Sequence, residues 1–335
     1  MQFSTSCSPF IPANTSVHQI MRQVLIALIP ALATMFWLFG FSILLQLLLA
    51  SSTALLAEAG CLWLRKRPIK AHLLDLSALI TAALLALAIP TIAPWWIGVS
   101  GTLFAIIIAK QIYGGLGFNP FNPAMAGYVF LLISFPQQMT AWQTPDTFLS
   151  YNDSLQLIFS GPILFDGLSS ATVLDSIKTA KASGLLSSEL SIAPIFGFIA
   201  GKSWELISLA YLVSGLWLIY RKVISWHIPV AVLSGLTIPA GISSLFDASS
   251  AVSPLFHLFA GASLCGAFFI ATDPVSAATS NSGRLIYGML IGLLIYIIRV
   301  WGGYPDAIAF AVLLANLAAP AIDVYTRPKV VNRIQ

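Results

Sequence analysis

The chain has 335 residues, of which 58% are hydrophobic and only 8% are charged, and its mean hydropathy is +0.89. Soluble domains carry about 25% charged residues, so this composition excludes an ordinary soluble protein and predicts an integral membrane protein. The net charge of +4 does not indicate a nucleic-acid partner, because the basic residues fall at the ends of apolar segments. Cys7, Cys61 and Cys265 are far apart, and we therefore expect no metal site.

A helix that spans the bilayer needs about 20 mainly apolar residues. The apolar segments of this chain do not alternate polar and apolar residues as the strands of a membrane barrel do. The predicted fold class is therefore all-α integral membrane, with about ten transmembrane helices. The predicted spans are 20–39, 42–64, 72–91, 95–113, 121–136, 204–220, 226–246, 254–272, 285–300 and 305–323.

The chain divides into a first five-helix half (1–136), a long loop (137–203) and a second five-helix half (204–335). Because each half has an odd number of spans, the two halves enter the membrane in opposite senses, as in the inverted repeats of transporters. Lys110 and Arg299 each precede a Gly-Gly pair where the fourth span of a half ends. Such pairs also simply end helices, but together with the matching proline-containing ends of the third and eighth spans they favour a repeat.

The distribution of basic residues predicts the orientation of the spans. Ten spans bring both termini to one side, and twelve of the sixteen Lys and Arg residues fall on that side. The excess of positive charge marks the cytoplasm. We therefore expect cytoplasmic termini and an outward-facing loop 137–203.

Segment 114–123 reads Gly-Gly-Leu-Gly-Phe-Asn-Pro-Phe-Asn-Pro and is dense in helix breakers. It is either a tight loop between two spans or a re-entrant element that lines a pathway or a site for a planar ring. Its glycines do not follow a predicted strand, so the segment is no nicotinamide fingerprint, and we expect no nicotinamide-oxidising site on this chain.

Charged residues in or beside spans are costly and often functional. Glu58 lies about two turns before Arg65. Snorkelling of a side chain toward the interface, or pairing of Glu58 with Arg65, would explain this acid within a span. Asp75, Glu205 and Asp306 lie close to span ends, where contact with lipid headgroups would explain them.

The outward loop contains a run of small residues that ends in a threonine. This run follows Asp166 and consists of Gly167, Leu168, Ser169, Ser170, Ala171 and Thr172. An accessible threonine after small residues suits the attachment of a bulky group to its hydroxyl. The alternative is structural, with Thr172 as the N-cap of a helix and Asp175 completing a pattern like a capping box.

Motifs along nearly the whole chain carry a resemblance to a known family. They are Ser8-Pro9-Phe10-Ile11, Tyr113 to Gly117, Asn119 to Met125, Asp273-Pro274-Val275, Gly302 to Asp306, and Tyr325 to Pro328. The chain resembles the D subunits of Rnf-type ion-translocating electron-transport complexes, which are relatives of the B subunit of the sodium-translocating NADH:quinone reductase. The resemblance implies a subunit that couples redox chemistry to ion translocation, in the bacterial cytoplasmic (inner) membrane, with other subunits as partners.

In that family a Ser/Thr-Gly/Ser-Ala-Thr motif is flavinylated by a transferase, which takes FMN from FAD and joins its phosphate to the threonine. Carried over, Thr172 is the attachment residue, and Ser169, Ser170, Ala171 and Asp166 are its motif context. Ser170 stands where some members have glycine. The resemblance also implies a non-covalent riboflavin, for which no residue is assigned, and no residue is given a catalytic role. An inverted-repeat channel or solute transporter without a redox role is the alternative function.

Overall fold

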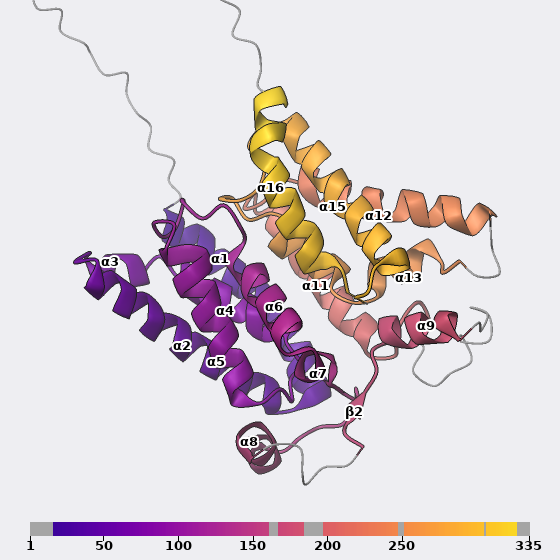
Figure 1. Cartoon of the computed structure of the whole chain (residues 1–335), viewed down its shortest axis with the longest axis horizontal. Coiled ribbons are helices and arrows are strands. Elements are labelled where there is room, and N and C mark those ends of the chain that lie inside the picture. The colour runs from indigo at the N-terminus through magenta and orange to yellow at the C-terminus, as the bar shows by residue number, and fades with distance from the viewer. Residues whose placement is uncertain (1–15, 161–166, 184–196, 247–250, 305, 327–335) are drawn as a thin grey trace, which may run out of the picture.

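The computed structural model describes residues 16–160, 167–183, 197–246, 251–304 and 306–326. Figure 1 shows the helices of the first half of the chain, from indigo to magenta, beside those of the second half, from orange to yellow. Among the described residues, five helices are long and apolar enough to cross a membrane, and four shorter helices are also apolar. The chain is therefore an all-α integral membrane protein, as its sequence predicts.

The first group of helices begins with well-capped ends. Ser16 accepts a hydrogen bond from the backbone N–H of Gln19 at 3.3 Å before the first helix. Asn122 caps the helix that starts at Pro123, whose ring suits the first helical position. The group consists of α1 (Val17–Phe39), α2 (Ser42–Leu64), α3 (Ile69–Leu73), α4 (Ser77–Ala88), α5 (Trp95–Leu103), the π-helix η1 (Phe104–Gln111), α6 (Pro123–Ser134) and α7 (Pro136–Thr140).

The second group differs from its prediction at one place, because predicted span 254–272 is interrupted. Gly261 lies in the interruption with φ +63°, and a Cβ at this position would lie 2.7 Å from a methyl carbon of Leu174. The group consists of α11 (Trp204–Tyr220), α12 (His227–Phe246), α13 (Pro254–Phe259), α14 (Ser263–Cys265), the π-helix η3 (Gly266–Ile270), α15 (Asn281–Trp301) and α16 (Ile308–Thr326).

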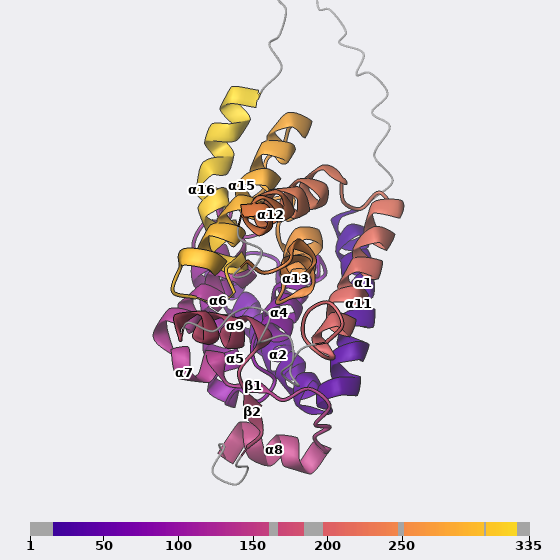
Figure 2. The same cartoon turned by 90° about the vertical axis from the view of Figure 1, so that its right-hand side faces the viewer.

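The segment between the two groups contains α8 (Tyr151–Ser160), α9 (Val173–Ala182) and a small antiparallel ribbon. Its strands are β1 (Trp142–Gln143) and β2 (Ser169–Ser170), and Trp142 pairs with Ser170. The ribbon and α8 lie at the end of the molecule opposite the C-terminal end of α16 (Figures 1 and 2).

The two groups pack along two seams, α1 against α11 and α6 against α16. A buried amide contact ties the second seam together. The backbone N–H of Asn122 donates to Oδ1 of Asn316 at 3.1 Å, and the Asn122 side chain donates to the carbonyl of Ile270 at 3.3 Å. The region boundaries at 136 and 203, and the inversion of one half relative to the other, stay predictions.

Candidate functional site

Thr172 follows strand β2, which carries Ser169 and Ser170, and it caps helix α9. The backbone N–H of Asp175 donates to Oγ1 of Thr172 at 3.2 Å, which is the hydrogen bond of an N-cap. The Thr172 hydroxyl in turn donates to Oδ2 of Asp175 at 2.6 Å. The predicted capping role is therefore confirmed, and Thr172 is half-buried, with the accessibility of its hydroxyl to a bulky group still a prediction. Asp166 lies outside the described residues.

Helix α9 is fastened to the second group of helices. The ammonium of Lys178 donates to the carbonyls of Gly302 and Tyr304, the latter at 3.0 Å. Partial burial lowers the pKa of Lys178, and the neighbouring Asp175 carboxylate acts in the opposite direction. Val173 and Leu174 are buried in a cluster with Ala200, Phe256 and Ala260. The position of Thr172 is thus set by both polar and apolar contacts of its helix.

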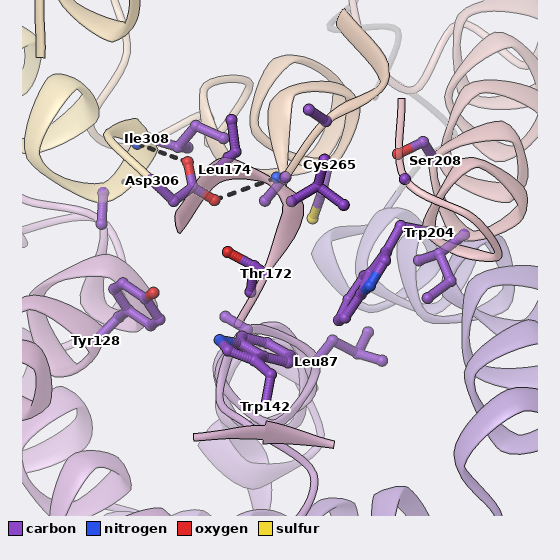
Figure 3. Close-up of a pocket in the computed structure, with 18 of the residues that line it drawn as sticks. Leu87, Tyr128, Trp142, Thr172, Leu174, Trp204, Ser208, Cys265, Asp306 and Ile308 are labelled. Carbon is purple, nitrogen blue, oxygen red and sulfur yellow. Dashed lines mark hydrogen bonds between the residues drawn. The ribbon is translucent and has the colours of Figure 1, made fainter. Parts of the chain in front are cut away.

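Thr172 lines a cavity of about 1200 Å³, mouth included, which we call the Thr172 cavity. Figure 3 shows Thr172 between Trp142, Trp204 and Tyr128. The rings of Trp142 and Trp204 meet edge to face, with centroids 5.3 Å apart. Three methionines also line the cavity: Met35, Met125 and Met139. Apolar walls with aromatic and thioether groups suit a planar aromatic ligand.

One acid on the cavity wall is paired with a buried arginine. Nη2 of Arg299 lies 3.4 Å from Oδ1 of Asp306, and the guanidinium also donates to the carbonyls of His257 and Ala260, at 2.8 and 3.1 Å. Oδ2 of Asp306 accepts from the backbone N–H of Ala262 at 3.2 Å. The Arg299–Asp306 pair thus binds backbone groups of α13 and of the turn before α14. Asp306 has partners inside the protein, which corrects its interpretation from the sequence as a headgroup contact.

A second cavity, of about 1210 Å³ with its mouth, is lined by Asn119, Asn122 and Lys110, and we call it the asparagine cavity. Lys110 is almost completely buried, and its ammonium lies 2.6 Å from Oε1 of the equally buried Glu58 and 2.7 Å from Oγ of Ser77. The predicted pairing of Glu58 with Arg65 is wrong. Segment 114–123 therefore contributes Asn119 and Asn122 to a cavity wall and is more than a tight loop.

The two cavities share two elements in their walls. On α6, Ala124 lines the asparagine cavity and the next residue, Met125, lines the Thr172 cavity. On η3, Phe269 lines the asparagine cavity and Ile270 the Thr172 cavity. Different faces of α6 and η3 thus contribute to the two cavities.

The sequence interpretation misses the aromatic wall. Trp142 and Trp204 lie near span ends, where the sequence favours a place in the aromatic belt at the membrane interface. The spacing of apolar residues in the sequence does not indicate that two tryptophans 62 positions apart lie beside the same threonine. Within the described part of the chain, no three His, Cys, Asp or Glu side chains come together as a set of metal ligands.

The fold and the site define an α-helical integral membrane protein with a cavity beside a capped threonine. A family model described as the NQR2, RnfD, RnfE family matches residues 4–332. Curated relatives, each named as the D subunit of an ion-translocating oxidoreductase complex, are 50% identical in Citrobacter koseri and in Aliivibrio salmonicida, and 49% identical in a strain of Escherichia coli. Each alignment covers 98% of this chain and 98–99% of the relative. The chain belongs to the NQR2, RnfD, RnfE family.

Proposed function

We propose that this chain is a membrane subunit of a multi-subunit complex that couples electron transfer to ion translocation, and that it carries FMN joined through its phosphate to Thr172. The curated relatives are named as subunits of an ion-translocating oxidoreductase complex. The flavin assignment rests on one observation: Thr172 lies on the wall of an apolar cavity, between Trp142 and Trp204.

The chemistry of the cavity supports this assignment. A tethered isoalloxazine needs a flat apolar space within reach of its phosphate, and Trp142, Trp204 and Tyr128 lie around Thr172. The flavin supplies the electron transfer when it is bound, and the protein contributes position and polarity. Electrons from NADH or another donor then enter the complex on other subunits, and a flavin transferase is the maturation partner.

The attachment is tested by mass spectrometry and by gel fluorescence. Cleavage before aspartates releases the short peptide Asp166–Leu174, which contains Thr172 as its only threonine. We expect this peptide to carry the mass of FMN less one water, and the denatured protein to fluoresce in a gel. Thr172→Ala removes both signals, and Thr179→Ala, an exposed threonine of α9 outside the motif, is its control and keeps them. Fluorescence that persists in Thr172→Ala contradicts the assignment of FMN to Thr172.

The asparagine cavity is the site we propose for a non-covalent riboflavin. Its wall combines apolar residues with the side chain of Asn119, and an amide matches the hydrogen-bonding edge of a flavin ring, whereas the Asn122 amide is already bonded to Met125 and Ile270. We expect denaturation of the Thr172→Ala protein to release riboflavin and no FMN. Asn119→Leu is expected to lower the riboflavin content in this assay and, in a protein that keeps Thr172, to leave the FMN on that residue in place.

A second function, ion conduction through the helix bundle, is favoured by the two cavities, which share α6 and η3 as wall elements. Transporters of inverted-repeat design place their binding site inside such a bundle. Ion uptake by vesicles that contain only the FMN-free Thr172→Ala protein supports a transporter without a redox role. Uptake that requires electron flow through the intact complex supports the first proposal.

The proposed location is the bacterial cytoplasmic membrane, with cytoplasmic termini and an outward Thr172. The twelve-to-four distribution of basic residues supports it. A single cysteine introduced at exposed Thr179 of α9 is expected to react with an impermeant maleimide in intact cells. Labelling of Thr179→Cys only after the cells are opened contradicts this orientation.

A further inference from the structure

We propose that Asp175 is the base that takes the hydroxyl proton of Thr172 when the flavin is attached, so that the chain supplies a catalytic group for its own modification. This inference rests on the proposed attachment of FMN at Thr172. It begins with the contact between Thr172 Oγ1 and Asp175 Oδ2, which are 2.6 Å apart with the hydroxyl as donor. A general base has to lie within hydrogen-bond distance of the proton that it removes.

The two hydrogen bonds of the hydroxyl also orient it for attack. A hydroxyl has one hydrogen and two acceptor lone pairs. The hydrogen of Thr172 is held by Asp175 Oδ2, and one lone pair accepts the backbone N–H of Asp175 at 3.2 Å. The second lone pair receives no hydrogen bond from any described residue, and Thr172 lines the cavity. The nucleophilic electron pair is thus available while the proton is already directed to its acceptor.

Asp175 takes part in none of the ion pairs among the described residues. Asp306, the other acid on the cavity wall, is paired with Arg299. Lys178, one turn after Asp175, is close enough for the Asp175 carboxylate to favour its charged form, but it gives its hydrogen bonds to the carbonyls of Gly302 and Tyr304. Oδ2 of Asp175 thus keeps the Thr172 hydroxyl as its hydrogen-bond donor.

The geometry is local and therefore survives movement of the helix. Thr172 and Asp175 belong to one turn of α9, so the pair stays intact if α9 swings away from the cavity to meet a transferase.

The step balances in atoms and charge. Oγ1 of Thr172 bonds to the phosphorus that carries the riboflavin chain of FAD, and the bond from that phosphorus to the bridging oxygen of the diphosphate breaks. The bridging oxygen leaves with AMP. The hydroxyl proton moves to Asp175 and from there to AMP or water, and no atom is oxidised or reduced.

The structure contains a matched control in the same interhelical segment. Ser150 and Asp153 at the start of α8 make the same two hydrogen bonds, hydroxyl to carboxylate at 2.6 Å and backbone N–H to hydroxyl at 3.3 Å. Replacing Asp153 removes an equivalent cap and an equivalent charge without touching Thr172. The pair separates loss of the base from loss of a helix cap.

The test follows covalent flavin on the full-length protein in detergent, with purified transferase and FAD, as fluorescence that survives SDS. Asp175→Asn keeps an acceptor for the hydroxyl but cannot take its proton, and we expect attachment about 10²-fold slower, at the low end of general-base effects, with an unchanged KM for the protein substrate. Asp153→Asn is expected to match the wild type. Added acetate is expected to restore part of the rate in Asp175→Ala.

Each outcome separates the two proposals. Wild-type protein that never acquires flavin overturns the proposed attachment itself. Flavinylated wild type together with equally fast Asp175→Asn overturns the role of Asp175 alone. A slow Asp175→Asn with a raised KM and an Asp175→Ala that acetate does not rescue show that Asp175 only supports the helix, which also overturns the inference.

Discussion

The ammonium of Lys110 and the carboxylate of Glu58 lie 2.6 Å apart, and each side chain is only 2% exposed. Gln111 and Ser77 complete the cluster, at 2.8 Å from Oε1 of Glu58 and 2.7 Å from Nζ of Lys110. A buried ion pair costs desolvation that only good geometry and extra hydrogen bonds offset. The cluster therefore fixes η1 against α2 at the wall of the asparagine cavity.

Removing one partner of this pair is expected to destabilise the protein strongly. Lys110→Met leaves the Glu58 carboxylate buried without its cation, at a cost of about 3–5 kcal/mol. The double variant Glu58→Gln with Lys110→Met is expected to recover much of the loss. Thermal unfolding in detergent measures both. Lys202→Met is the control, because its pair with Asp146 is exposed and worth about 0–1 kcal/mol. Equal losses in Lys110→Met and Lys202→Met contradict the prediction.

Arg299 is expected to tolerate no replacement by lysine. An ammonium cannot reach the carbonyls of His257 and Ala260 and the carboxylate of Asp306 together, as the planar guanidinium does. We expect Arg299→Lys to lose about 1–3 kcal/mol. Hydrogen exchange should rise at residues 260–262, between α13 and α14. Arg284→Lys, at a half-buried site with one long contact of 3.4 Å, serves as the control and should leave that exchange unchanged.

Trp204 is expected to quench the fluorescence of a flavin at Thr172. An indole in contact with an excited isoalloxazine transfers an electron to it, so Trp204→Phe should brighten the folded protein while the SDS-denatured signals stay equal. Trp226→Phe is the matched control, because Trp226 stacks on His227 with ring centroids 4.2 Å apart and does not line the Thr172 cavity. Because Trp142 also lines the cavity, a folded double variant Trp142→Phe with Trp204→Phe that is as dim as the wild type shows that the flavin ring does not lie there.

Lys178 is expected to hold α9 against the second group of helices. Lys178→Met removes its hydrogen bonds to the carbonyls of Gly302 and Tyr304, an effect of about 1 kcal/mol for this partly exposed group. Hydrogen exchange over 173–180 should increase, while global unfolding changes little. Exchange in this stretch that stays at the wild-type level argues that Val173 and Leu174 hold the helix by burial alone.

Much of the helical layout could be predicted from hydropathy, and most long-range contacts could not. The spans 42–64 and 204–220 coincide with α2 and α11, because apolar runs of these lengths end at polar residues. Span 254–272 is as apolar as its neighbours, and at its interruption Gly261 lies close to Leu174 of the segment between the two groups. Local pattern carries no information on such a tertiary contact.

The candidate site shows the same difference between local contacts, which the sequence predicts, and long-range contacts, which it does not. The cap formed by Thr172 and Asp175 is a contact over three residues, and its sequence pattern predicts it. Glu58 and Lys110 are 52 positions apart, and the nearer Arg65 is the only partner that helical spacing suggests. Arg65 instead donates to Gln111, at 3.1 Å from its side-chain oxygen. Pairing inside a membrane bundle depends on which helices are neighbours, which composition does not reveal.

The fastening of α9 bears on how the proposed flavin would be attached. The buried Leu174 and the anchored Lys178 hold Thr172 half-covered. If FMN is joined to Thr172 as proposed, a transferase reaches the hydroxyl only when α9 opens locally. The lysine anchor would then control the rate of attachment as well as the position of the threonine.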